Sequence, residues 1–132
     1  MLVVDASILV DIVTGTPTAA THRDRLRADD EQAAPEIVDV EVFGVIRRRY
    51  LFGRLDRTAA SLAVEGLHDW SAERFGHRPF LSRAWELRHN VRGWDAFYVA
   101  LAEALDATLL TTDARLRRAK GPRCEIEVLS AD

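Results

Sequence analysis

Four acidic residues in this sequence, Asp5, Glu41, Asp95 and Asp113, could act together on one metal ion or substrate. Two carboxylates about 4 Å apart repel each other by roughly 4 kcal/mol at an effective dielectric constant of 20, so four in one pocket need protonation or a cation. Oxygen ligands without a neighbouring His or Cys suit Mg²⁺ or Mn²⁺. Such an ion can bind a phosphate oxygen and lower the pKa of an attacking water. The chemistry implied is metal-assisted phosphodiester hydrolysis.

The four acids are expected at one edge of a parallel sheet. Asp5 directly follows the apolar run LVV, and Asp113 follows the run ATLLTT. Asp95 lies in the first turn of a predicted helix, and Glu41 in the second turn of another. Because strand carboxyl ends and the N-termini of the following helices share one edge of such a sheet, the carboxylates could meet there.

Each acid also has an ordinary structural explanation. Asp5 and Asp113 could cap the helices that follow them, Asp95 could interact with a helix dipole, and Glu41 could be a solvated helix residue. The positions of the four acids taken together favour a functional site, because Asp5 and Asp113 each end an apolar strand.

The elements that must position these acids alternate between strands and helices. Strands are predicted at residues 2–4, 32–34, 68–71, 107–110 and 125–129. Helices are predicted at residues 8–13, 18–30, 36–52, 57–66, 80–88, 95–105 and 113–118. Gly53 should end the third helix, and Asp56 should cap the fourth. The alternation predicts an α/β fold, a three-layer α/β/α sandwich around a central, mainly parallel sheet of about five short strands.

Length and composition narrow the function classes. A chain of 132 residues is expected to form one domain over residues 1–132. The net charge of −3 argues against a strongly basic protein that coats nucleic acid. The single cysteine, Cys124, excludes an internal disulfide and a multi-cysteine zinc site. With no basic segment before the first strand and no apolar run of ~20 residues, we expect a cytoplasmic protein without membrane contact.

Three alternatives to an enzyme of this kind can be weighed from the residues. A receiver-like Mg²⁺-binding module needs an acid pair after the first strand and a Lys beyond the fifth, whereas the one lysine, Lys120, precedes the last predicted strand. A phosphatase of the Asp-x-Asp type lacks its second acid, because Ser7 stands there. A catalytically dead interaction domain would have no reason to retain four mutually repelling acids.

Three segments of the chain resemble PIN-domain ribonucleases, and most closely the VapC toxins of bacterial toxin–antitoxin pairs. They are VVDASILVD, PEIVDVEVFGVIRR and NVRGWDAFYVALAEALDATLLTTDARL, and the resemblance spans residues 2 to about 129. The last segment is the most specific, because an acid, an aromatic-rich helix and a strand closing in TTD follow one another. The sequence departs from many relatives at Gly93 and Trp94, where Ser or Thr and Tyr are common.

The resemblance implies an Mg²⁺- or Mn²⁺-dependent endoribonuclease that hydrolyses RNA through a metal-activated water. Asp5, Glu41, Asp95 and Asp113 would be its catalytic and metal-binding residues. The same resemblance places Ser7, Thr112 and Asn90 beside them. It also implies a homodimer, a cognate antitoxin that inhibits the enzyme, and a structured RNA substrate such as transfer RNA or ribosomal RNA loops.

Arginines near the acids could contact RNA phosphate. Arg88 and Arg92 flank Asn90 and are therefore expected near the entrance of the pocket. The triplet Arg47–Arg49 is the second candidate. The tryptophans are expected in the core or at an interface rather than as base-stacking platforms: Trp70, Trp85 and Trp94.

Overall fold

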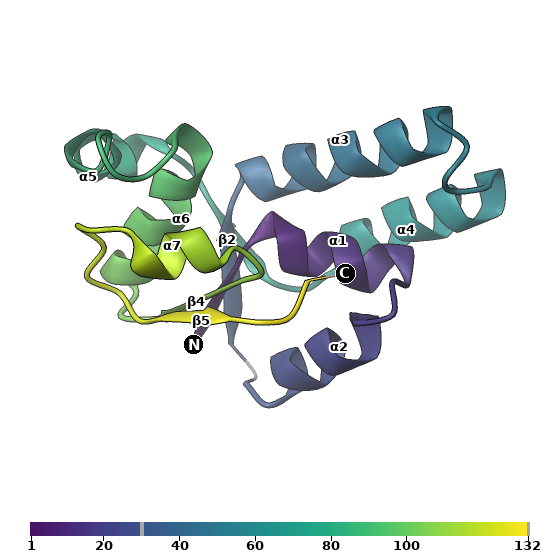
Figure 1. The fold of residues 1–132 in the computed structure, drawn as a ribbon, viewed down its shortest axis with the longest axis horizontal. Coiled ribbons are helices and arrows are strands. Elements are labelled where there is room, and N and C mark those ends of the chain that lie inside the picture. The colour runs from purple at the N-terminus through teal and green to yellow at the C-terminus, as the bar shows by residue number, and fades with distance from the viewer. Residues whose placement is uncertain (30, 132) are drawn as a thin grey trace.

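A five-stranded sheet forms the centre of the computed structural model, which describes residues 1–29 and 31–131 (Figure 1). The strands are β1 (Leu2–Val4), β2 (Gln32–Pro35), β3 (Glu73–Phe75), β4 (Thr108–Thr111) and β5 (Ile126–Val128). All four pairings are parallel, and the strand order is β3-β2-β1-β4-β5. The predicted parallel α/β sheet is therefore confirmed, with β1 as its innermost strand.

Helices follow the strands and cover the sheet. They are α1 (Ala6–Thr14), α2 (Ala19–Arg27), α3 (Ile37–Leu51), α4 (Arg57–Asp69), α5 (Leu81–Glu86), α6 (Gly93–Ala104) and α7 (Ala114–Arg118), with a 3₁₀ turn, η1, at Arg78–Phe80. The predicted end of the second helix at Asp30 lies outside the described residues. Within the described part of the chain, no helix combines the length and the apolar character needed to cross a bilayer.

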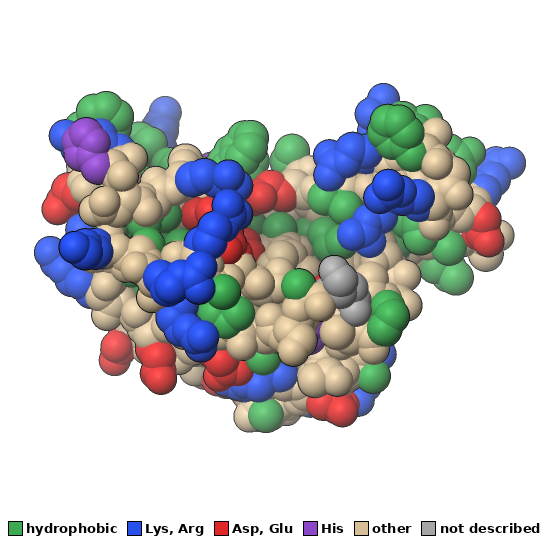
Figure 2. Space-filling model, in the orientation of Figure 1, with side chains coloured by type: hydrophobic (Ala, Val, Ile, Leu, Met, Phe, Trp, Pro, Cys, Tyr) green, Lys and Arg blue, Asp and Glu red, His purple; other side chains and the backbone are tan. Residues whose placement is uncertain are grey.

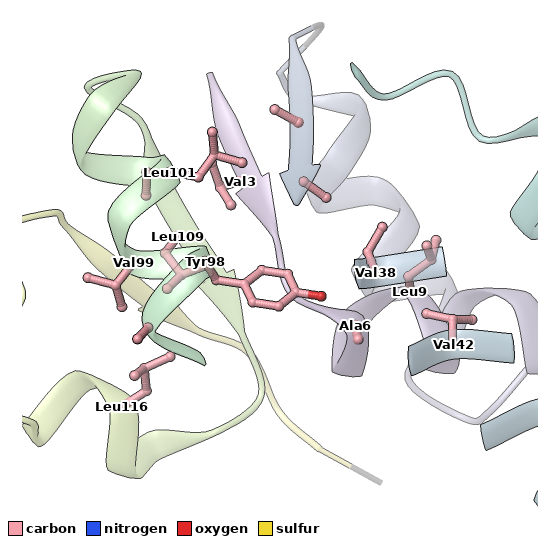
Figure 3. Packing of buried hydrophobic residues seen from close by; sticks show 14 of the residues in the cluster. Val3, Ala6, Leu9, Val38, Val42, Tyr98, Val99, Leu101, Leu109 and Leu116 are labelled. Atoms are coloured by element: carbon pink, nitrogen blue, oxygen red, sulfur yellow. The ribbon is translucent and has the colours of Figure 1, made fainter. Parts of the chain in front are cut away.

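The alternation of side chains along β1 produces an apolar core on each side of the sheet. Leu2 and Val4 pack with Ile8 of α1 and Leu26 of α2 on one side. Val3 belongs to the larger cluster on the other side, which includes most of the buried face of α6 (Figure 3). A strand buried on both faces is held rigidly, so the residue that follows β1 is held rigidly too.

Helices α3 and α4 form an arm that extends away from the sheet (Figure 1). Gly53 adopts a positive φ of 74° just after α3, as expected for a glycine that ends a helix. The Asp56 side chain accepts a 2.7 Å hydrogen bond from the backbone N–H of Ala59, so the predicted cap is confirmed. The arm positions one of the four acids, Glu41, on a different element from the other three.

One predicted strand is wrong. Residues 68–71 do not form a strand, because α4 continues to Asp69 and the third strand is Glu73–Phe75. Arg74 lies inside that strand and is held by tertiary contacts: its guanidinium donates to the carbonyl oxygens of Leu67, Trp70 and Ala72 and pairs with Asp39 at 2.9 Å. These contacts are invisible to a pattern of apolar residues.

Candidate active site

Three of the four predicted acids line one cleft, which we call the main cleft. Asp5, Glu41 and Asp95 line it together with residues of α1 and α3, and its volume is about 680 Å³. Figure 2 shows acidic side chains in a hollow of the surface, with Lys and Arg side chains on both sides. The structure therefore brings together acids that are far apart in the sequence.

Asp5 is held by hydroxyl groups at the end of β1. Its Oδ2 accepts hydrogen bonds of 2.8 Å from Ser7 Oγ and of 2.8 Å from Thr111 Oγ1. Burial raises the pKa of Asp5, and the two hydroxyl donors oppose that rise. The predicted Thr112 lies beside Asp5, because it lines the same cleft and its backbone N–H donates to Ser7 Oγ at 3.2 Å, but the second hydroxyl that binds Asp5 belongs to Thr111.

Glu41 is held by a tyrosine from the core. The Tyr98 hydroxyl donates a 2.9 Å hydrogen bond to Glu41 Oε1. The Tyr98 ring is buried in α6, and Figure 3 shows it projecting toward Val38 and Ala6. Burial raises the pKa of Glu41 against the opposing effect of this hydrogen bond, and the charges of Asp5 and Asp95 raise it further. Sequence analysis missed Tyr98, although a tyrosine within an apolar helix commonly needs a partner for its hydroxyl.

Asp95 lies in the first turn of α6. Its pKa is raised to about 6, first by burial and then by the charges of Asp5 and Asp113. The charges of Arg92 and Arg115 oppose this rise. Mutual effects of this kind show that the carboxylates share one electrostatic environment.

Asp113 differs from the other three acids because it already has a cationic partner. Its carboxylate caps α7 by accepting the Arg115 backbone N–H at 2.9 Å. The Arg115 guanidinium also binds both carboxylate oxygens, each at 3.1 Å. These bonds lower the pKa of Asp113. The capping explanation for Asp113 is thus confirmed, and a role beside the other acids does not conflict with it.

The donor set fits a hard divalent cation. The residues offer carboxylate oxygens. The pKa values of Asp5, Glu41 and Asp95 are raised mainly by burial and further by neighbouring negative charges, and a cation would offset both effects. Among residues 1–29 and 31–131, no three carboxylate, imidazole or thiolate groups already enclose an ion-sized space. Mg²⁺ retains several water ligands and commonly uses only one or two carboxylates directly, so a closed cage is not required for this ion.

The remaining predicted residues lie at different distances from the acids. Arg92 lines a second hollow, of about 550 Å³, with Glu41 and Asp95, as its predicted role requires. Asn90 and Arg88 are exposed, and neither is among the described residues that line the main cleft or the second hollow. The Arg88 guanidinium instead stacks 4.4 Å from the centre of the Trp85 ring. From the arginine triplet, Arg48 and Arg49 line the far end of the main cleft.

Of the three tryptophans expected in the core or at an interface, Trp70 packs against the core, and the other two are exposed. Trp70 is partly buried, packs against both clusters and donates its indole N–H to Gln32 Oε1 at 2.8 Å. Trp85 and Trp94 are 67% and 63% exposed. Helix α6 begins at Gly93, and Arg92 is its N-cap residue.

Similarity to known proteins agrees with this geometry. Residues 2–122 match the family model of the PIN domain. The chain is 39% identical over 128 residues to Ribonuclease VapC1 of Mycobacterium tuberculosis (strain H37Rv), which covers 96% of both chains. VapBC2 from Rickettsia felis, solved with a DNA fragment from its promoter, superimposes with a TM-score of 0.71 at 16% identity and covers 99% of this chain and 98% of that one. VapC20 of Mycobacterium tuberculosis, a Sarcin-Ricin loop cleaving toxin, superimposes with a TM-score of 0.62 at 18% identity and covers 83% of this chain and 87% of that one. The chain therefore belongs to the PIN-domain family and, within it, to the VapC ribonucleases.

Proposed function

We propose that this protein is a toxin that hydrolyses RNA phosphodiester bonds with the help of Mg²⁺ or Mn²⁺. The observation that carries the proposal is the electrostatic coupling of Asp5, Glu41 and Asp95 in one cleft. Repulsion among carboxylates that have no cationic partner destabilises a fold. A bound cation would explain why the cleft keeps these three carboxylates.

Asp5, Glu41 and Asp95 would hold the ion, and Asp113 would support it from the rim. Bound there, a divalent ion supplies a Lewis acid for the phosphate and lowers the pKa of a water molecule. Ser7 and Thr111 both donate to Oδ2 of Asp5, so Oδ1 would be the oxygen that faces the ion. Tyr98 holds Oε1 of Glu41 in the same way and leaves Oε2. The carboxylates of Asp5 and Glu41 are thus oriented before the ion or the substrate arrives.

The substrate class follows from the relatives and from the charge around the cleft. The curated relatives are named ribonucleases, and arginines stand on both sides of the acids, Arg92 on one and Arg48 on the other. Guanidinium groups suit the phosphates of RNA. We therefore expect a structured RNA, such as a transfer RNA or ribosomal RNA loop, and a cytoplasmic location where such RNA is present.

The protein would be inhibited by a cognate antitoxin. The main cleft continues from the acids along α3, where Ile37, Val40 and Val45 provide an apolar wall. A peptide with apolar residues and one basic side chain complements such a surface. A homodimer is expected as well, because large apolar side chains such as Leu81 and Trp85 are exposed on α5.

The receiver-like alternative receives no support from the fold. The one lysine, Lys120, lies between α7 and β5 and does not line the main cleft.

The proposal is tested by RNA cleavage with purified protein. Wild-type protein should cleave structured RNA with Mg²⁺ or Mn²⁺ and stop when EDTA is added. Asp5→Asn and Asp95→Asn should reduce the rate by several orders of magnitude. Glu65→Gln removes an exposed carboxylate of α4 and serves as the matched control. Activity that survives chelation, or equal activity in all variants, would contradict the proposal.

A further inference from the structure

A second hollow adjoins the main cleft and shares its acids. The second hollow is lined by Glu41, Arg92, Gly93, Trp94, Asp95 and Phe97. Glu41, Trp94 and Asp95 line both hollows, so these three residues form the boundary between them. A ligand seated in the second hollow is therefore next to the acids without covering the main cleft.

We propose that Trp94 is a stacking platform for a base of single-stranded RNA in the second hollow. This inference rests on the proposed ribonuclease function and names the residue that positions the nucleotide beside the reacting phosphate. Trp94 immediately precedes Asp95 in the first turn of α6, and 63% of its surface is exposed. An indole that lines the cleft beside the acids, and lies outside the core, offers a base an exposed π-face.

The neighbouring residues leave room for a base. Gly93 lines the same hollow, and a Cβ atom built there would meet no atom within 4 Å, so its missing side chain leaves open space. Phe97 adds an aromatic side chain one turn further along α6 and is packed partly against the core. The second hollow thus combines the exposed ring of Trp94, the partly buried ring of Phe97 and the open space at Gly93.

The charges beside Trp94 favour a nucleotide over an apolar peptide. The Arg92 charge acts on both Asp95 and Asp113, which shows that the guanidinium lies near the acids. A base stacked on Trp94 would bring its own phosphate between this cation and the carboxylates that hold the divalent ion. An apolar protein partner on Trp94 would instead bury the charges of Glu41 and Asp95 without compensating them.

The experiment measures RNA binding separately from RNA cleavage. In an Asp5→Asn background, which prevents cleavage, the affinity for a labelled single-stranded oligoadenylate is measured by fluorescence anisotropy at constant salt. Trp94→Ala should weaken binding roughly ten- to hundredfold, as expected for the loss of one base–aromatic stack. Trp94→Phe should restore most of the affinity, because a phenyl ring still stacks. Phe52→Ala is the control, since Phe52 is an aromatic residue that is 75% exposed and lines neither hollow.

A second readout uses the wild-type catalytic residues. Trp94→Ala should raise KM for RNA more than it lowers kcat, and it should change the preferred nucleotide next to the cleaved bond. Binding by Trp94→Ala equal to that of wild type would refute the inference. So would unchanged RNA binding together with a loss of self-association, which would show that Trp94 contacts a protein. If the wild-type protein itself neither binds nor cleaves RNA, the proposed ribonuclease function fails. That result can be told apart from a failure of the Trp94 proposal, in which the wild type binds RNA and Trp94→Ala binds it equally well.

Discussion

Replacing Asp95 with asparagine should stabilise the metal-free protein at neutral pH. The pKa of Asp95 is raised from 3.8 to about 6 in the folded state, mainly by burial and then by the charges of Asp5 and Asp113. Above pH 6 the carboxylate is ionised in the folded and the unfolded protein, and the folded state bears the cost. Asparagine has nearly the same shape without the charge, so the cost disappears.

The gain in stability expected for Asp95→Asn follows from the pKa shift of Asp95. A rise of about two pKa units corresponds to roughly 3 kcal/mol. Because Asp95 is partly exposed and solvent screens its charge, we expect about 1–2 kcal/mol. In a chain of this length that gain raises the melting temperature by roughly 4–7 °C.

The stability difference between Asp95→Asn and the wild type should increase with pH. Below about pH 4, Asp95 is protonated in both states and the variant gains nothing. Between pH 4 and pH 6 the unfolded state of the wild type loses its proton before the folded state does, so the wild type becomes progressively less stable than Asp95→Asn. Above pH 6 the difference should be constant.

The assay is thermal unfolding in EDTA from pH 4 to pH 8, with the two proteins compared at each pH so that other titrating groups cancel. Glu65→Gln, on the exposed face of α4, should show no such gain. Adding Mg²⁺ should reduce the difference, because the ion offsets the repulsion in the wild type. A variant that is less stable than the wild type at pH 7.5, or a gain that does not depend on pH, would refute the reasoning.

Three further substitutions test the contacts around the site and the fold. Tyr98→Phe removes the hydroxyl that donates to Glu41 and should lower the free energy of unfolding by about 1–2 kcal/mol in urea titrations, whereas an unchanged midpoint would show that the hydrogen bond contributes nothing. Thr111→Val removes the hydroxyl that donates to Asp5, and it should cost about 2 kcal/mol of stability and most of the cleavage rate; full activity would mean that Asp5 is oriented without it. Glu103→Gln weakens the ion pair with Arg83 of α5. Burial alone would raise the Glu103 pKa, but the hydrogen bonds from Arg83 lower it. The wild type should therefore be more stable than Glu103→Gln at pH 7 and lose this advantage as the pH falls below about 4.5. An advantage that does not shrink as the pH falls from 4.5 to 3 in chemical denaturation would contradict this account of Glu103.

Most strands and helices were predictable from the sequence because their apolar residues recur at the spacing that buries them in the cores on the two sides of the sheet. The run at residues 2–4 is buried on both faces, and the predicted cap at Asp56 is formed. The third strand was not predictable in this way. It is short and only partly buried, and its Arg74 is held by carbonyl oxygens and by Asp39. Contacts between segments, rather than the local pattern, determine where this strand lies.

The acids of the candidate site were predictable from their positions at strand ends, but their supporting contacts were not. The choice between Thr111 and Thr112 depends on which of these adjacent side chains lies on the same face of the sheet as the Asp5 side chain, and a shift of one residue reverses it. Tyr98 lies in a helix whose apolar surroundings suggested packing alone. The exposure of Trp94 depends on where α6 begins relative to the cleft, which the sequence does not specify.

The arginine that binds Asp113 also contributes to the charge balance around the four predicted acids. Four carboxylates, together with Arg92 and Arg115, leave a formal charge of minus two near the acids. One divalent ion would make this region neutral, and a second would leave it positive until RNA phosphates arrive. The affinity for a second ion and the affinity for RNA must then rise together, because each ligand supplies the charge that the other needs. Metal titrations in the presence and absence of RNA should therefore differ in their midpoints by the same factor that metal adds to RNA affinity.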